Sequence, residues 1–202
     1  MEGICRWGSS GVFRVAPLAR LNASDGMATP LAQQDYQKMY EALVGKPVHS
    51  TLAFHWARLI ETLYACERML ELAQDPEFTS SEVRNIPTAI SEEWAGVEEA
   101  PRGTLFHHHK TDGQGILTEV NLIVATQNNS APICMSIEKA ARSLISNGEV
   151  SDGILDMIEM AFRACDPCHA CATHSLPRVM PLQVNVFDCR GDLVRTLKRN
   201  AM

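Results

Sequence analysis

The clearest pattern of apolar and polar positions lies over residues 52–75. Apolar side chains recur there at alternating intervals of four and three residues, at Leu52, Trp56, Leu59, Leu63, Cys66 and Leu70. This spacing places them on one face of an α-helix. Ser50 or Thr51 can cap the start of the helix, and Asp75-Pro76 marks its end. Such a helix would run about 35–40 Å at 1.5 Å per residue.

Weaker patterns predict the remaining elements. Shorter helices are expected over 32–44, 133–145 and 152–164, where apolar residues return every three or four positions. Gly and Pro residues interrupt residues 1–30, which are expected to be irregular apart from a short extended piece over 12–15. The acidic, proline-containing segment 76–102 is expected to be a loop.

Two pairs of segments are typical of β-hairpins. Residues 103–110 and 116–125 flank a turn that contains two glycines, and residues 182–187 and 193–197 flank a second turn. The pattern therefore predicts an α+β chain that is mainly α, with long helices and small antiparallel hairpins. We expect a single domain over residues 1–202.

Composition and charge narrow the class of protein. Apolar residues make up 46% of the chain and charged residues 21%, which is ordinary for a soluble globular protein. The net charge of −6, with no basic block, argues against a nucleic-acid partner. No apolar run approaches the roughly 18–20 residues that cross a membrane, and the N-terminus lacks the apolar core of a secretory signal. We therefore expect a cytoplasmic protein without a membrane span.

The seven cysteines add candidate chemistry. Their number is odd, and Cys165, Cys168 and Cys171 fall within seven residues. In a reducing compartment such a cluster favours metal or redox chemistry over disulfides. Cys168 and Cys171 form a Cys-x-x-Cys pair of soft thiolate donors, and His174 can face the same region. Thiolates select zinc, nickel, copper(I) or iron–sulfur species.

The spacing alone leaves several sites open. Cys168, Cys171, His174 and one further ligand would suit structural zinc. Cys165 with the other two cysteines has the spacing of an iron–sulfur run, and a buried group without a metal is a third possibility. A thioredoxin-type redox pair is disfavoured because no parallel βαβ pattern surrounds it. Residues 107–109 are three consecutive histidines, but strand alternation sends the middle one to the opposite face, so they predict no metal triad.

Four segments in order resemble the large subunit of NiFe-hydrogenases. Residues 166–174 have the form Asp-Pro-Cys-x-x-Cys-x-x-His, the family's signature near the C-terminus. Residues 99–103, Glu-Ala-Pro-Arg-Gly, are followed by two of the histidines and resemble a second family segment. Residues 121–126 resemble its cyanide-contacting strand, and residues 13–22 resemble an upstream segment. The likeness is closest to the cytosolic, cofactor-coupled branch, which includes viologen-, deazaflavin- and NAD-reducing hydrogenases.

The resemblance implies a metal centre and the C-terminal half of the large-subunit fold. Cys168 resembles a terminal nickel ligand, and Cys171 resembles the thiolate that bridges nickel and an iron carrying cyanide and carbon monoxide. His174 resembles the last residue of the mature subunit, which binds a magnesium or iron ion. Terminal thiolates such as Cys168 can also accept a proton during dihydrogen cleavage.

The resemblance also implies roles for three other residues. Arg102 resembles the guanidinium held beside the open metal position, where fixed charge would assist the splitting of dihydrogen. Pro101 and Thr126 resemble residues that line the cyanide ligands, with Thr126 donating a hydrogen bond. Taken without the resemblance, Arg102 is more often a surface or salt-bridged arginine, and Thr126 an ordinary strand residue.

The chain departs from the family at its N-terminus. The family's first Cys-x-x-Cys pair, in a motif Arg-x-Cys-Gly-Ile-Cys, is absent here, and residues 2–5 echo only its end. The chain therefore supplies two of the four expected metal ligands. The N-terminal half would be a separate polypeptide, lost through a frameshift, or not included in residues 1–202, and the helices are expected to expose apolar surface made for it.

Residues 175–202 occupy the position of the family's C-terminal extension. A dedicated maturation protease removes that extension once nickel-loading factors have acted. Alternating apolar residues at Leu182, Val184 and Val186 predict a strand in it. The alternative is a permanent tail, as in related complexes that never cleave it.

The sequence thus predicts a nickel-dependent hydrogenase subunit that carries half of a nickel–iron site for reversible dihydrogen oxidation. An iron–sulfur small subunit would receive the electrons. The alternatives are a non-catalytic hydrogenase-like assembly subunit or truncated relic, and a zinc or iron–sulfur module. The electron acceptor is not identified, since it resides on partner subunits.

Overall fold

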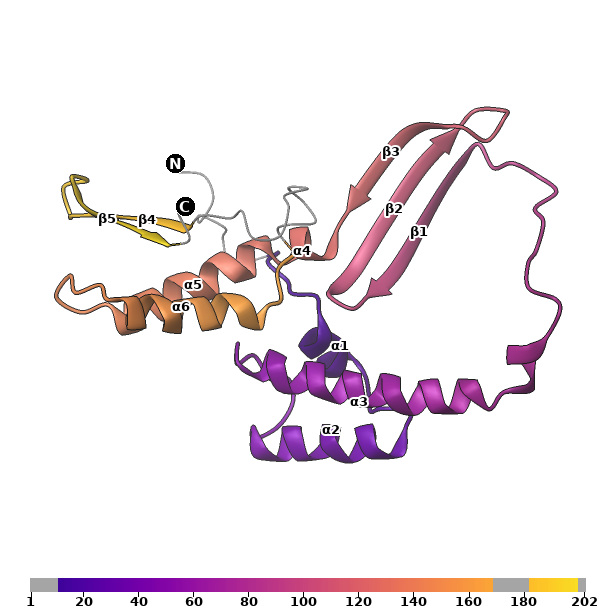
Figure 1. Cartoon of the computed structure of the whole chain (residues 1–202), viewed down its shortest axis with the longest axis horizontal. Coiled ribbons are helices and arrows are strands. Elements are labelled where there is room, and N and C mark those ends of the chain that lie inside the picture. The colour runs from indigo at the N-terminus through magenta and orange to yellow at the C-terminus, as the bar shows by residue number, and fades with distance from the viewer. Residues whose placement is uncertain (1–10, 169–181, 200–202) are drawn as a thin grey trace. The chain divides into compact units, whose positions relative to one another are not determined.

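The computed structural model describes residues 11–168 and 182–199 (Figure 1). The chain divides between Pro167 and Cys168 into two compact units. The first unit holds a group of helices, a three-stranded sheet and a pair of helices, and the second holds a hairpin. The mainly helical α+β class with small antiparallel sheets is confirmed.

Three helices form the core of the first unit: α1 (Pro17–Ala23), α2 (Pro30–Ala42) and α3 (Ala53–Ala73). Both α1 and α2 begin at a proline, whose fixed φ suits the first helical turn. Both helices pack against α3 (Figure 1). The buried core is made of Ala16, Leu18, Leu21, Ala32, Tyr36, Met39, Tyr40, Val48, Ala53, Phe54, Ala57, Ile60 and Ala164.

A glutamate of α3 caps the start of α2. The Glu67 carboxylate accepts hydrogen bonds from the Thr29 hydroxyl at 2.6 Å and from the amides of Leu31 and Ala32 at 3.1 and 3.0 Å. These amides belong to the first turn of α2, where N–H groups lack partners within the helix. The negative charge also complements the helix dipole, so this contact fixes α2 on α3.

Helix α3 is apolar on two faces. Its buried face carries Ala53, Phe54, Ala57 and Ile60. The stripe that predicted the helix lies mostly on the other side, where Leu59 is 69% exposed. We call the exposed members of that stripe the α3 seam: Leu52, Leu59, Cys66 and Leu70. The expected exposure of apolar surface is therefore confirmed.

The sheet has the antiparallel order β1-β2-β3, with β1 (Glu93–Ala100), β2 (Gly103–Thr111) and β3 (Leu117–Ile123). The hairpin of β2 and β3 is confirmed. The loop predicted for 76–102 is wrong in part, because the segment contains η1 (Pro76–Thr79) and β1. Strand β1 is formed through its pairing with β2 across a two-residue turn. Its own sequence shows no alternation of buried and exposed residues, because nearly all of its side chains are exposed.

Two other local predictions are corrected near the ends of these elements. Residues 17–23 are helical rather than irregular, and residues 12–15 form no strand. The chain leaves the sheet after Ile123 and turns into the short helix α4 (Ala125–Asn128). The Val124 amide donates to the Gln127 side chain at 3.3 Å, which closes this turn and ends the strand two residues before its predicted end.

Two further helices complete the first unit, α5 (Ser130–Leu144) and α6 (Asp152–Ala164), which pack side by side (Figure 1). Both are confirmed. The Ser151 hydroxyl caps α6 by accepting from the Ile154 amide at 3.4 Å. None of the helices in the described ranges is long and apolar enough to span a membrane.

The second unit contains the hairpin of β4 (Leu182–Phe187) and β5 (Leu193–Arg199), as predicted. The Asp188 carboxylate closes its turn by accepting from the amides of Arg190 and Asp192 at 2.8 and 3.0 Å. The predictions for residues 1–10 and 169–181 lie outside the described residues.

Candidate functional site

The predicted site residues sit on different elements. Pro101 and Arg102 form the turn between β1 and β2, and Thr126 lies in the first turn of α4. Cys168 follows the end of α6 by four residues and opens the second unit. Cys171 and His174 lie outside the described residues.

Arg102 is held by the residue that begins the cysteine motif. Its Nε atom donates to the main-chain oxygen of Asp166 at 3.1 Å and lies 3.1 Å from the carboxylate Oδ2 atom. Asp166 has a φ of 50°, a left-handed conformation that Asp tolerates better than most residues. Both side chains are more than 40% exposed, so the ion pair adds little stability. Its effect is positional, because it fixes the turn of the sheet beside a residue 64 positions later in the sequence.

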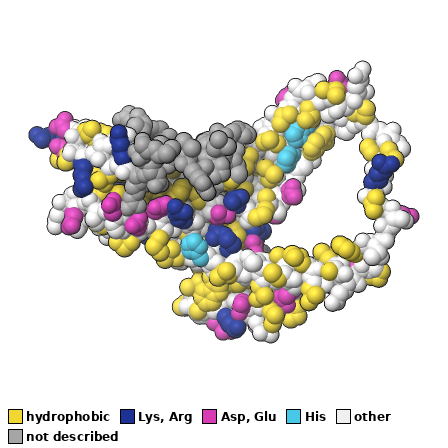
Figure 2. All heavy atoms as spheres, viewed as in Figure 1, with side chains coloured by type: hydrophobic (Ala, Val, Ile, Leu, Met, Phe, Trp, Pro, Cys, Tyr) yellow, Lys and Arg dark blue, Asp and Glu magenta, His cyan; other side chains and the backbone are white. Residues whose placement is uncertain are grey.

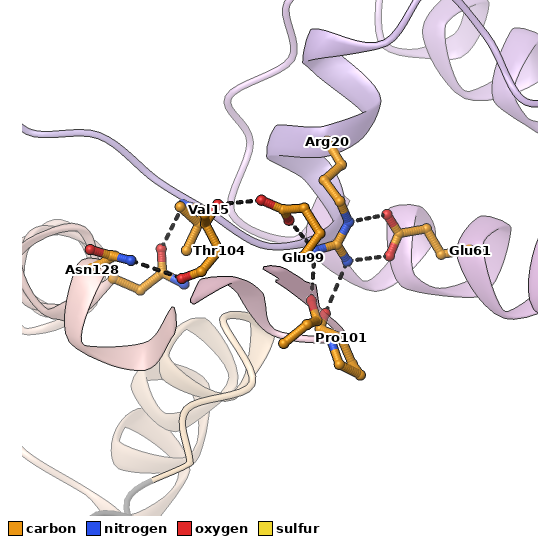
Figure 3. A network of polar contacts seen from close by, with 9 residues as sticks. Val15, Arg20, Glu61, Glu99, Pro101, Thr104 and Asn128 are labelled. Atoms are coloured by element: carbon orange, nitrogen blue, oxygen red, sulfur yellow. Dashed lines mark hydrogen bonds and ion pairs between the residues drawn. The ribbon is translucent and has the colours of Figure 1, made fainter. Parts of the chain in front are cut away.

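Arg20 of α1 fixes the same turn from the other side (Figure 3). Its guanidinium pairs with both carboxylate oxygens of Glu61 on α3, at 2.7 and 2.5 Å. It also contacts the Glu99 carboxylate at 3.0 Å, and it donates to the carbonyl oxygens of Ala100 and Pro101 at 2.9 and 3.0 Å. Helix α1, helix α3 and the turn are thereby joined through one side chain.

Gly103 permits close contact between this turn and the chain before α1. A Cβ atom at Gly103 would lie 2.3 Å from Val15 Cγ2 and 2.7 Å from the Ala16 nitrogen. Gly103 also has a φ of +129°, which L side chains rarely adopt. Both facts require glycine at this position, so the glycine of the Glu-Ala-Pro-Arg-Gly segment has a steric explanation.

Residues 128–136 also make hydrogen bonds to the chain before α1 and to the start of β2. The Val15 amide donates to Asn129 Oδ1 at 3.0 Å. Asn128 Nδ2 donates to the Thr104 carbonyl at 3.1 Å (Figure 3). Arg14 donates to the Ser136 hydroxyl at 2.7 Å. Segments 13–22, 99–104 and 121–129 and the start of 166–174 therefore converge within the first unit.

Thr126 needs a correction. The sequence places it at the end of a strand, whereas the structure places it in α4, because the chain turns after Ile123. Its neighbours Asn128 and Asn129 hold the other segments, so Thr126 remains next to the site along the chain. Its contact with a cyanide ligand stays a prediction.

A cavity of about 690 Å³ opens beside the Arg20 contacts. It lies between α1, α3 and the β1–β2 turn, and Arg20, Glu61, Pro101 and Asp166 are among its lining residues. The sequence did not point to Arg20 or Glu61 as part of the site, because no local spacing links residues 41 positions apart. Only the fold brings them together.

Cys165 behaves as a core residue. It is buried at the end of α6, and burial raises the pKa of its thiol despite the nearby charges of Arg14 and Arg58.

The three histidines divide between the two faces of the sheet, as strand alternation predicts. His107 Nδ1 and His109 Nε2 lie 3.2 Å apart on one face of the sheet, where His109 also stacks against Trp94. His108 points to the other face and contacts Glu93 at 2.7 Å. Across residues 11–168 and 182–199, no group of three or more His, Cys, Asp or Glu side chains is placed to hold a metal ion.

The described arrangement thus defines a class of site: a cationic turn fixed beside the start of a Cys-x-x-Cys motif at the end of a helix. Comparison with known proteins gives the family. The model for nickel-dependent hydrogenases matches residues 6–174. The chain belongs to the nickel-dependent hydrogenase family.

Individual relatives agree with this membership. The chain is 49% identical to a subunit of the F420-non-reducing hydrogenase of Archaeoglobus profundus, over 94% of this chain and 39% of the relative. It is 40% identical to the beta subunit of the NAD-reducing hydrogenase HoxS of Cupriavidus necator, over 91% of this chain and 38% of the relative. A solved structure of an NAD+-reducing [NiFe]-hydrogenase in the H2-reduced state matches with a TM-score of 0.77 at 38% identity, over 82% of this chain and 37% of that chain.

The chain spans about two-fifths of the length of these relatives. The expected resemblance to the branch that includes the NAD-reducing hydrogenases is confirmed, because the relatives include F420-non-reducing and NAD-reducing hydrogenases. The alternative of a zinc or iron–sulfur module unrelated to hydrogenases is not favoured.

Proposed function

We propose that this chain forms the C-terminal part of a NiFe-hydrogenase large subunit that takes part in reversible dihydrogen oxidation. The observation that supports this most directly is the contact of Arg102 with Asp166. It brings the Pro-Arg-Gly turn to the residue two positions before Cys168. Family membership makes nickel and iron the expected metals of the complete site.

The donor chemistry of the chain fits half of such a centre. Cys168 and Cys171 would supply two soft thiolates, which suit nickel, and the latter would also reach an iron that carries cyanide and carbon monoxide. His174 would bind a magnesium or iron ion. Residues 1–202 lack the family's Arg-x-Cys-Gly-Ile-Cys motif, so we propose that this motif, located outside residues 1–202, supplies the other two thiolates, and we expect residues 1–202 alone to be inactive. A bound nickel–iron centre would supply the redox chemistry.

Arg102 and its neighbours would prepare the surroundings of the metals. Arg102 carries a permanent positive charge, and Asp166 limits the directions in which its guanidinium can point. A fixed charge assists a reaction more than a mobile one, because no reorganisation is needed when charge develops. Pro101 and Thr126 would line the cyanide ligands, with the Thr126 hydroxyl as a donor.

Partners follow from the exposed apolar surfaces. The α3 seam and the sheet both present apolar side chains (Figure 2). On the sheet, Val120 and Leu122 are exposed on one face and Val97 on the other. Exposed apolar surface of this kind marks an interaction site. We propose that the family's N-terminal half, whether part of the same protein or a separate polypeptide, covers these surfaces. We also propose that an iron–sulfur small subunit receives the electrons and that the complex works in the cytoplasm.

The tail would belong to maturation. We propose that a maturation protease removes residues 175–202 after nickel-loading factors have acted. Intact mass spectrometry of protein from its native source tests this. We expect a chain that ends at His174, and a chain that ends at Met202 in the metal-loaded protein would show that the tail is permanent.

Metal analysis tests the proposed function. The chain would be produced with the N-terminal half, the maturation proteins and the small subunit, and nickel, iron and hydrogen-dependent viologen reduction would be measured. We expect nickel and iron in the purified complex, and loss of nickel in Cys168→Ala. Cys134→Ala, which removes a half-buried cysteine of α5 outside the α3 seam, is the matched control. A complex that contains only zinc would contradict the proposal.

A further inference from the structure

Arg20 connects the proposed reactive arginine to the helical core. The three nitrogens of its guanidinium contact four acceptor groups: two carboxylates and two main-chain carbonyls. Its side chain is 24% exposed and that of Glu61 is 22% exposed. Charge-assisted bonds in such a partly buried place are stronger than those between neutral groups.

The two carbonyls lie where they control the direction of Arg102. Ala100 is the last residue of β1 and pairs with Gly103, so residues 101 and 102 are the whole of the connecting turn. Arg20 binds the carbonyls of Ala100 and Pro101, which are the two peptide units before Arg102. With Gly103 pressed against Val15, the turn is held at both of its ends.

We propose that Arg20 is a positioning residue for Arg102. Glu61 anchors Arg20 to α3, Arg20 fixes the carbonyls of the turn, and the turn delivers Arg102 to Asp166. The role of Arg102 in the reaction rests on the proposed function. The chain of contacts from Glu61 through Arg20 to Arg102 does not. A lysine at position 20 has one compact ammonium group without the planar fork, so it cannot satisfy a carboxylate side-on and two carbonyls together.

The test observes Arg102 itself in the full-length chain. The Nε–H signal of Arg102 is followed by nitrogen-15 NMR and assigned by its loss in Arg102→Lys. In the unaltered chain, this N–H donates to Asp166 and should exchange slowly with solvent. In Arg20→Lys and Arg20→Gln, we expect its exchange to be faster by about tenfold or more, the effect of losing one or more charge-assisted bonds. Arg142→Gln, which removes an exposed ion pair with Glu138 on α5, should leave it unchanged.

A purely structural role for Arg20 predicts a different result. Overall stability would fall, while the Arg102 signal of the molecules that remain folded would not move. That outcome overturns the proposal. If Arg20→Gln fails to fold, Arg20→Lys and Glu61→Gln provide the same comparison, because each weakens the fork without removing the whole network.

A second readout separates this inference from the proposed function. In the assembled complex, Arg20→Lys should lower hydrogen-dependent viologen reduction by about tenfold at unchanged nickel content, in line with the looser Arg102. Unchanged turnover with a loosened Arg102 would overturn the claim that turnover depends on this positioning, and an Arg102 signal that stays unchanged in Arg20→Lys would overturn the positioning itself. Absence of nickel and iron from the unaltered complex would instead overturn the proposed function, and the NMR comparison would stand by itself.

Discussion

At the residue scale, the sequence motifs identify side chains whose surroundings only the fold reveals. Arg102 and Cys168 belong to recognisable segments, so they can be predicted. Arg20 and Glu61 cannot, because an arginine and a glutamate 41 positions apart carry no signal of their pairing. The contact of Asp166 with Arg102 cannot be predicted either. The sequence motif includes Asp166, but the contact depends on how the sheet meets the end of α6.

Gly103 gives a prediction about stability. Gly103→Ala would force a Cβ atom against Val15 and Ala16 at a positive φ. We expect the free energy of unfolding to fall by about 2–4 kcal/mol, the combined effect of overpacking and backbone strain. Urea denaturation of the full chain measures it. The matched control is Gly113→Ala, where no heavy atom lies within 4 Å of the added Cβ. Equal losses in the two variants would contradict the close contact.

Arg102 gives a prediction about activity. In the assembled complex, Arg102→Gln should reduce hydrogen-dependent viologen reduction by about 10²–10³-fold, the usual effect of removing one preorganised electrostatic group. Nickel content should stay the same, because Arg102 is not among the proposed ligands. Arg142→Gln serves as the control on a distant surface. Full activity of Arg102→Gln would remove Arg102 from the proposed site.

At the scale of elements, a strong apolar periodicity predicts the long helices well, whereas strands such as β1 depend on pairing with a neighbouring strand. Helix α6 lies at its predicted bounds, and α3 lies within two residues of its own, because a long apolar pattern marks each helix. Ser151 caps α6, but the predicted cap of α3 at Ser50 or Thr51 is wrong, because Leu52 occupies the N-cap position and no side chain caps that helix. Strand β1 escapes prediction because six of its eight side chains are exposed and it gains its order from β2. Helix α1 escapes prediction because it has seven residues, too few for a periodic pattern.

The contact of Glu67 with α2 gives a prediction about pH. The Thr29 hydroxyl, followed by the amides of Leu31 and Ala32, lowers the pKa of Glu67 in the folded chain. A carboxylate whose pKa is lowered on folding stabilises the fold above its unfolded pKa of about 4.5, and this contribution is lost as pH falls through the folded pKa.

We therefore expect Glu67→Gln to be less stable than the unaltered chain at pH 7, and the two to converge as pH falls well below about 4.5. Thermal denaturation between about pH 7 and pH 3 measures the difference. Glu82→Gln removes an equal charge from an exposed segment after η1 and is the control. A stability difference that is constant across this range would contradict the capping role.

At the scale of the whole molecule, the main feature is a chain that leaves apolar faces uncovered. Helix α3 has one face in the core and the α3 seam on the other side. The sequence alone shows a single strong stripe and does not say which face the core uses. Small residues decide this, since Ala53 and Ala57 allow close packing beside Phe54 and Ile60.

The α3 seam gives a prediction about association. Leu59→Glu combined with Leu70→Glu should reduce self-association of the isolated chain and should also weaken its binding to the N-terminal half. Analytical ultracentrifugation and co-purification measure the two effects. Val44→Glu, at a residue that is 93% exposed outside the seam, is the control. Unchanged binding to the N-terminal half would show that this partner does not use the seam.

The fastening of the β1–β2 turn has a consequence for the order of assembly. Every contact described for Arg102 and its turn, from Arg20, Glu61, Gly103 and Asp166, is made within this chain. These contacts do not involve residues outside this chain, so binding of a further segment or subunit does not have to supply the entropy of ordering the turn. A division of the large subunit ahead of these segments would separate the ligands of the metals but would leave the arginine and its support together. Such a protein could be supplied in two pieces without dismantling the part that must be most rigid.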